Sequence, residues 1–65
     1  MKIVINGKET ETGAETVGAL LEELDISSGK VAVEVNFKVI RKCDYHTSAV
    51  SEGDNVEIVN FVGGG

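Results

Sequence analysis

The chain opens with alternating apolar and polar positions. In KIVIN, Ile3 and Ile5 fall on one face of an extended segment, and the residues between them fall on the other. Asn6-Gly7 follows, and both residue types tolerate the positive φ angles of a two-residue hairpin turn. The polar stretch KETET at 8–12 is therefore predicted to return as a short strand at the edge of a sheet.

The apolar spacing changes after a short break, GAE. Val17, Leu20, Leu21 and Leu24 recur at the i, i+3, i+4, i+7 spacing of a half-buried helix. Thr16 stands at the N-cap, where its hydroxyl can accept from a free backbone N–H of the first turn. The pattern predicts one amphipathic helix that ends at the turn-forming residues DISSGK.

Two other features of this helix carry expectations of their own. Gly18 costs a helix about 1 kcal/mol relative to alanine, so we expect it to mark close packing against the sheet. The acidic run Glu22, Glu23 and Asp25 is predicted to form a solvated face.

The stretch VAVEV gives the clearest strand, because Val31, Val33 and Val35 share one face. Asn36-Phe37-Lys38 is predicted to turn the chain into a short return strand.

The remaining third of the chain ends in another strand. CDYHTSAV has no clear period and predicts a loop with a turn of helix, and the residues 51–54 predict a tight turn. NVEIVNFV then closes the domain, with Val56 and Ile58 inward and Glu57 outward.

The predicted order is strand, strand, helix, strand, strand, strand. One helix covering one face of a mixed sheet is the economical way for so short a chain to build two layers. The fold class is therefore α+β, a β-grasp (ubiquitin-like) architecture of about five strands with one crossing helix. We expect residues 1–62 to form the domain and residues 63–65 to form a flexible glycine tail.

Composition narrows the function classes. The chain has 65 residues and a net charge of −5, and it lacks the clustered basic residues that bind nucleic acid. No apolar stretch reaches the length of a membrane helix, and the N-terminus turns polar too early for a signal peptide. A single cysteine excludes an intrachain disulfide. We expect a cytoplasmic protein that is a monomer when free and binds neither nucleic acid nor membrane.

The chain resembles a known family. VAVEVN, its return strand and EGDNVEIVNFVGGG are similar to the sulfur carrier proteins of thiamin biosynthesis, the ThiS family. The resemblance covers essentially the whole chain, including ETVGALLEEL, and its most specific part is GDxVEIVxFVGGG with the terminal diglycine. FVGGG alone could be a frayed end or a slender reactive arm, and the resemblance favours the arm.

The resemblance implies a definite chemistry for this arm. Gly65 is the residue whose carboxylate is adenylated and converted to a thiocarboxylate, and Gly63 and Gly64 form the tail that presents it. An adenylating partner (ThiF-like) uses ATP, a sulfur donor such as the persulfide of a cysteine desulfurase supplies sulfur, and a thiazole synthase (ThiG-like) receives it. The chain itself would be a carrier rather than an enzyme, with no catalytic residue and no bound cofactor.

The chain departs from the family at three places. The family commonly shows a Pro-Arg pair followed by a Trp, and this chain has Arg41-Lys42 and Tyr45 in those positions. Phe37 stands at a hairpin tip that is usually small or polar. These departures concern partner contacts and local packing rather than the chemistry of the tail.

The other reactive side chains give weaker candidates. A lone cysteine such as Cys43 is more often a packed or unreactive thiol than a persulfide carrier. A catalytic dyad of Cys43 and His46 is not favoured, because no third group in the sequence pattern orients the two side chains. His46 has no neighbours at metal-ligand spacing, and we therefore expect no metal site. By alternation, Val59 and Phe61 lie on the sheet face away from the helix, and we predict that they dock the adenylating enzyme rather than pack against the base of the tail.

Two other functions stay open at this level. A carrier of another pathway, such as the small subunit of molybdopterin synthase, shares the fold and the diglycine. A noncovalent β-grasp docking module would share the fold alone and would not need the diglycine.

Overall fold

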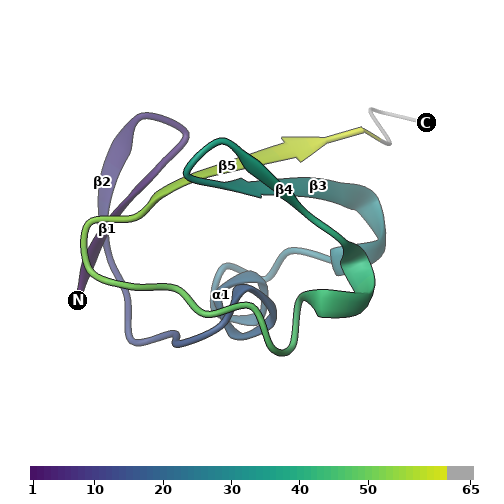
Figure 1. Ribbon diagram of the computed structural model, residues 1–65, viewed down its shortest axis with the longest axis horizontal. Coiled ribbons are helices and arrows are strands. Elements are labelled where there is room, and N and C mark those ends of the chain that lie inside the picture. Colours follow the sequence, from purple (N-terminus) through teal and green to yellow (C-terminus); the bar gives the residue numbers. More distant parts are fainter. Residues whose placement is uncertain (62–65) are drawn as a thin grey trace.

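A computed structural model of the chain describes residues 1–61. Five strands form one mixed sheet in the order β2-β1-β5-β3-β4, with β1 parallel to β5 and the other neighbours antiparallel. The strands are β1 (Lys2–Ile5), β2 (Lys8–Glu11), β3 (Val31–Val35), β4 (Lys38–Ile40) and β5 (Asn55–Asn60). One α-helix, α1 (Val17–Glu23), lies across one face of the sheet (Figure 1). The predicted β-grasp architecture is confirmed; residue 62 and the predicted glycine tail lie outside the described residues.

Both β-hairpins turn through residues with positive φ angles. Asn6 and Gly7 have φ angles of 50° and 82°, and Asn36 and Phe37 have φ angles of 52° and 69°. Two positive φ angles in succession match the right-handed twist of the flanking strands. The turns predicted at these positions are confirmed, although an aromatic residue such as Phe37 adopts this conformation at a steric cost.

Helix α1 begins after Thr16 and ends before the turn-forming residues DISSGK, both as predicted. The Thr16 hydroxyl accepts a hydrogen bond from the backbone N–H of Ala19 at 3.1 Å. Asp25 then reverses the chain with a φ angle of 59°, and the backbone N–H of Ile26 bonds to the carbonyl of Leu21 at 2.9 Å. Because this reversal follows Leu24 directly, the Leu24 side chain is 36% exposed. The prediction that Leu24 continues the buried stripe was wrong, and Ile26 packs against the core instead.

The core lies between α1 and the sheet, and loops contribute to it as well. Its apolar members are Ile3, Ala14, Val17, Leu20, Leu21, Val31, Val33, Tyr45, Val50 and Val56. Tyr45 comes from the segment after β4, and its hydroxyl donates to the Val31 carbonyl at 3.3 Å. Three of these core residues, Ala14, Tyr45 and Val50, lie in segments where the sequence shows no apolar period.

Gly18 packs against a loop rather than against the sheet. A Cβ atom at this position would lie 3.3 Å from the Tyr45 carbonyl oxygen and 3.4 Å from Nδ1 of His46. The Gly18 backbone N–H donates to the same carbonyl at 2.7 Å. The close approach predicted from this glycine is present, but its predicted partner was wrong.

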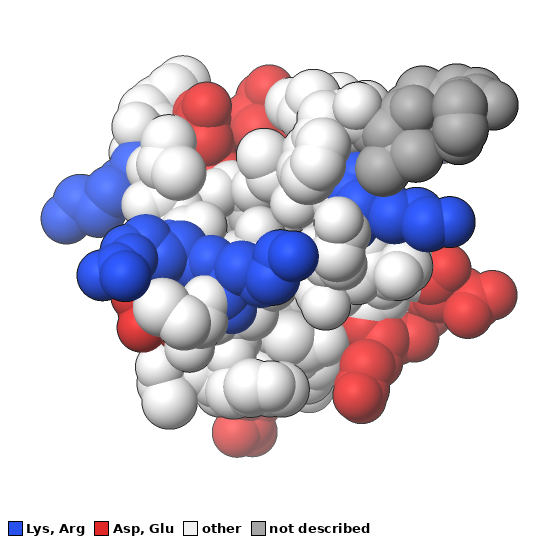
Figure 2. Space-filling model, turned by 90° about the vertical axis from the view of Figure 1, so that its right-hand side faces the viewer, with Lys and Arg blue, Asp and Glu red and all other residues white. Residues whose placement is uncertain are grey.

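Charge is unevenly distributed over the molecule. Viewed from the end at which β5 leaves the sheet, basic side chains lie across the middle of the surface and acidic side chains lie toward its margins (Figure 2). The basic side chains on this surface contrast with the net charge of −5 of the whole chain.

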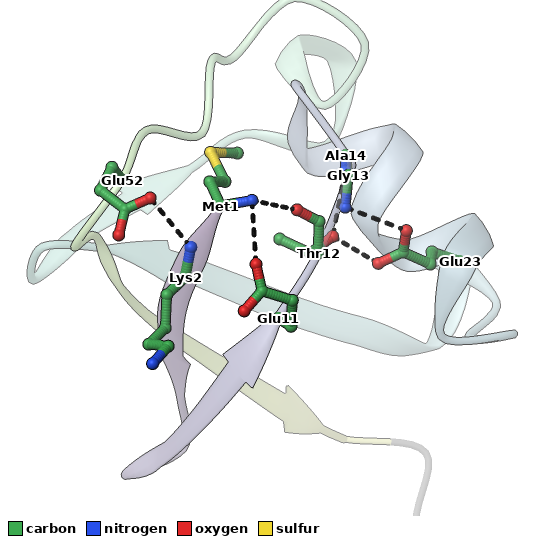
Figure 3. Close-up of polar contacts among 8 residues, drawn as sticks. All are labelled: Met1, Lys2, Glu11, Thr12, Gly13, Ala14, Glu23 and Glu52. Carbon is green, nitrogen blue, oxygen red and sulfur yellow. Dashed lines mark hydrogen bonds and ion pairs between the residues drawn. The ribbon is translucent and has the colours of Figure 1, made fainter.

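One acidic side chain of the helix is not simply solvated. Glu23 accepts hydrogen bonds from the Thr12 hydroxyl and, at 3.4 Å, from the backbone N–H of Gly13 (Figure 3). Thr12 is buried, and its hydroxyl also accepts from the backbone N–H of Ala14 at 3.0 Å. These bonds fasten the β2–α1 connection to the last turn of the helix. Glu22, Glu23 and Asp25 are all exposed, as predicted, and Glu23 has this structural role in addition.

Candidate functional site: the end of the sheet before the glycine residues

Strand β5 carries the chain toward its C-terminus from the middle of the sheet. Its last residue, Asn60, pairs with Val31 at the start of β3. The backbone N–H of Phe61 then donates to the Lys30 carbonyl at 3.2 Å, so backbone pairing continues to the last described residue. Figure 1 shows where β5 ends at this end of the sheet, which we call the tail end. Gly63, Gly64 and Gly65 lie outside the described residues, and their predicted roles stay predictions.

The two side chains predicted to dock a partner are exposed beside this point. Val59 is 53% exposed and Phe61 is 61% exposed. Val56, one step out of phase with them, is fully buried, so the predicted alternation along β5 is present. Their role in docking stays a prediction, since the structure contains no partner.

The exposed apolar surface extends beyond these two residues. Val59 pairs with Ala32, which is also exposed, on the neighbouring strand β3. Val39 on β4 is 67% exposed and pairs with Glu34, two residues along β3 from Ala32. Val39 was not predicted as part of this surface, although its alternation with the inward Ile40 indicates an outward position.

Cys43 and His46 line one hollow but are not arranged as a catalytic pair. The hollow has a volume of about 620 Å³ and lies between α1 and the 3₁₀-helix η2 (Lys42–Asp44). Both side chains are exposed, and the Cys43 thiol makes a weak hydrogen bond to Oδ1 of Asp44 at 3.9 Å. No hydrogen bond joins Cys43 to His46 within residues 1–61, so neither activates the other.

Two further findings concern metal binding and membrane insertion. Among residues 1–61, no three side chains of the usual metal-ligating types gather in one place. No helix in the same range is long and apolar enough to span a membrane.

The departures Tyr45 and Phe37 fall at very different places. Tyr45 is 4% exposed and belongs to the core, so it cannot contact a partner. Phe37 is 80% exposed, but its hairpin lies beside the start of β5, at the opposite end of the sheet from Phe61. Neither Tyr45 nor Phe37 therefore contributes to the exposed surface at the tail end.

A five-stranded mixed sheet with a parallel β1–β5 pair and one crossing helix defines a β-grasp protein whose C-terminal strand is central. Comparison of the sequence is more specific. The chain belongs to the ThiS family, whose sequence pattern matches residues 3–65.

Named relatives and a solved structure agree with this assignment. The chain is 53% identical over its whole length to a thiazole synthase of Paramagnetospirillum magneticum and 40% identical to one of Magnetococcus marinus, and it spans 20% of each of those proteins. It is 36% identical to the sulfur carrier protein ThiS of Bacillus subtilis, with 94% of this chain and 96% of the relative covered. The crystal structure of the thiamine biosynthesis protein ThiS from Geobacter metallireducens superposes with a TM-score of 0.84 at 36% identity, over all of both chains.

Proposed function

We propose that this chain is the sulfur carrier of thiamin biosynthesis. Its Gly65 carboxylate is adenylated by a ThiF-like enzyme and converted to a thiocarboxylate, which donates sulfur to a ThiG-like thiazole synthase. The observation that carries the proposal is the family match over residues 3–65, which includes the glycine end. The Bacillus subtilis relative supports it, because that protein is named a sulfur carrier and has nearly the same length.

The chemistry requires activation of the carboxylate. A carboxylate repels nucleophiles, so attack of its oxygen on the α-phosphorus of ATP first makes an acyl adenylate and releases pyrophosphate. The terminal sulfur of a donor persulfide then displaces AMP, and reduction of the resulting acyl disulfide by a thiol leaves a thiocarboxylate on Gly65. Donors of the enzyme must surround the tetrahedral intermediate closely, and a glycine end has no Cβ to hold them away.

The carrier contributes a slender end and a surface, and the partners contribute the catalytic groups. The chain is therefore a cosubstrate rather than an enzyme, with no cofactor of its own and with ATP bound by the partner. We place it in the cytoplasm as a monomer when free, since it has no disulfide to form and a charged surface.

Two of the relatives support the identity of the final acceptor. Proteins named thiazole synthase contain a segment similar to the whole of this chain within a much longer polypeptide. A carrier and the enzyme that consumes its sulfur gain from such proximity, because a linked reactant reaches a high effective concentration. This pattern favours thiazole formation over molybdopterin synthesis.

The docking surface gives the first test. Phe61→Ala should raise the carrier concentration needed for half-maximal adenylation roughly thirtyfold, the equivalent of about 2 kcal/mol of binding. The rate at saturation should change little, because the carboxylate chemistry is untouched. The measurement is ATP–pyrophosphate exchange by a ThiF-type enzyme across carrier concentration, and exchange that does not depend on the wild-type chain would contradict the proposed function itself.

Phe37→Ala is the matched control for this variant. It removes an even more exposed aromatic side chain at the opposite end of the sheet, so half-maximal adenylation should stay at the wild-type concentration. If Phe61→Ala instead lowers the unfolding temperature strongly and binds normally once folded, Phe61 is a packing residue and docking occurs elsewhere.

The thiol should be dispensable. Cys43→Ser should form the thiocarboxylate at close to the wild-type rate, because the exposed Cys43 thiol has only a weak contact, to Oδ1 of Asp44 at 3.9 Å, in the described part of the chain. The measurement is the time course of sulfur incorporation by intact mass. Loss of incorporation in a folded Cys43→Ser protein would make the thiol a relay on the route to the carboxylate.

A further inference from the structure

Three basic side chains surround the tail end of this acidic chain. Lys30 immediately precedes β3, and its carbonyl accepts from the backbone N–H of Phe61. Arg41 directly follows Ile40, which pairs with Val33, so the register of β4 carries it toward the start of β3. Figure 2 faces this end of the molecule and shows basic side chains across its surface.

Lys42 directly follows Arg41 and begins the 3₁₀-helix η2. Its ammonium nitrogen lies 3.8 Å from the position that a Cβ would occupy on Gly29, the neighbour of Lys30. Two segments of the chain, one at Lys30 and the other at Arg41-Lys42, therefore bring half of the six basic residues of the chain to one end of the sheet. We call Lys30, Arg41 and Lys42 the basic rim.

The basic rim is not neutralised within the described part of the chain. Among residues 1–61, the single ion pair joins the Met1 ammonium to Glu11 at 3.2 Å, at the other edge of the sheet. The nearest acidic candidates are Glu22, which lines the same hollow as Lys42, and Asp44 of η2. Neither forms an ion pair with the rim, although acidic residues outnumber basic ones by 11 to 6.

We infer that the basic rim pairs with acidic side chains around the mouth of the site in the adenylating enzyme that receives the tail. The inference rests on the proposed function and adds the chemistry of the partner surface. A molecule of charge −5 is repelled by an acidic surface in most orientations and attracted through its basic end. The rim therefore orients the carrier during approach, so that the glycine end arrives first.

The length of the tail favours a protein surface over the nucleotide as the partner of the rim. Four residues follow Phe61 in the sequence, and a chain of four residues spans at most about 14 Å. When the carboxylate at the end of these residues reaches the α-phosphorus of ATP, the rim stays at the other end of the span. It then lies at the mouth of the enzyme site, away from the nucleotide. Contacts there change the rate of association and its salt dependence more than they change the chemical step.

The test compares two triple variants that change the net charge equally. Lys30→Gln/Arg41→Gln/Lys42→Gln removes the rim, and Lys2→Gln/Lys8→Gln/Lys38→Gln removes the three other basic side chains, all of them exposed. Association of each purified chain with a ThiF-type adenylating enzyme is measured by stopped-flow fluorescence at low and at high ionic strength. ATP–pyrophosphate exchange is measured in parallel at saturating carrier.

Removing the rim should slow association roughly tenfold or more at low salt and flatten its salt dependence. The control triple should change the association rate much less, and exchange at saturation should stay near the wild-type rate for both. Equal slowing by the two triples would show that only net charge matters and would overturn the inference. A raised KM for ATP with unchanged association would assign the rim to the nucleotide, which also overturns it.

This experiment distinguishes failure of the rim inference from failure of the proposed function. A wild-type chain that binds in a rim-dependent way but supports no exchange contradicts the proposed function and leaves the rim assignment standing. A wild-type chain that does not associate with the enzyme even at low salt contradicts both.

Discussion

Leu21→Ala should lower the free energy of unfolding by about 2–5 kcal/mol. Leu21 is 1% exposed, and the turn that ends α1 packs Ile26 against the same core. Truncation therefore removes buried contacts and leaves a cavity that the short helix cannot close. The loss is a large share of the roughly 5–15 kcal/mol that stabilises a typical domain. Chemical denaturation followed by circular dichroism measures it.

Leu24→Ala is the matched control for this prediction. The two variants delete the same atoms, but Leu24 lies past the last residue of α1 and is 36% exposed. Its truncation should cost less than about 1 kcal/mol. Similar losses in the two variants would mean that the buried face of the helix is assigned wrongly.

Local patterns were sufficient to predict most of the fold. The period of two identified the inward residues of β3 and β5, such as Val33 and Val56, because each of these strands has one face against the helix. Asn6-Gly7 identified the first hairpin because few other pairs adopt two positive φ angles at low cost.

The errors lie where the structure depends on contacts distant in sequence. Leu24 was wrongly assigned to the buried stripe because the chain reverses at Asp25, directly after it. Tyr45 and Val50 enter the core from a segment without periodicity, and only the fold brings them to α1. Thr12 shows the same limit, since its burial is compensated by Glu23, eleven residues away.

The candidate site was predicted only where it depends on the pattern of a single strand. Alternation along β5 placed Val59 and Phe61 on the outer face, a property of one strand alone. The basic rim was missed because only the sheet order brings Lys30 beside Arg41 and Lys42, which lie further along the chain. Clustering along the sequence does not show this proximity in space.

Deleting Gly65 should abolish sulfur acceptance completely. The deletion removes the carboxylate at the position that the enzyme must reach and leaves the next one a residue shorter, so the reacting atoms no longer meet. The fold should be unaffected, because the core and the hydrogen bonds described for it lie within residues 1–61. Thermal unfolding of the truncated chain should therefore match that of the wild type.

Two results for the truncated chain would contradict these expectations. If it acquires sulfur at its new terminus at the wild-type rate, the position of the carboxylate does not matter, and the assignment of Gly65 is wrong. If it unfolds at a much lower temperature, the glycine end has a structural role that this account does not include.

The most direct measurement is the intact mass of the 65-residue chain after incubation with an adenylating enzyme, ATP and a sulfur source, followed by fragmentation to locate the change. The ThiS protein of Bacillus subtilis serves as the positive control for the enzyme. The account predicts exchange of one oxygen for one sulfur, located on Gly65 and dependent on ATP. An unchanged mass while the control protein is loaded, or sulfur located on Cys43, would contradict it.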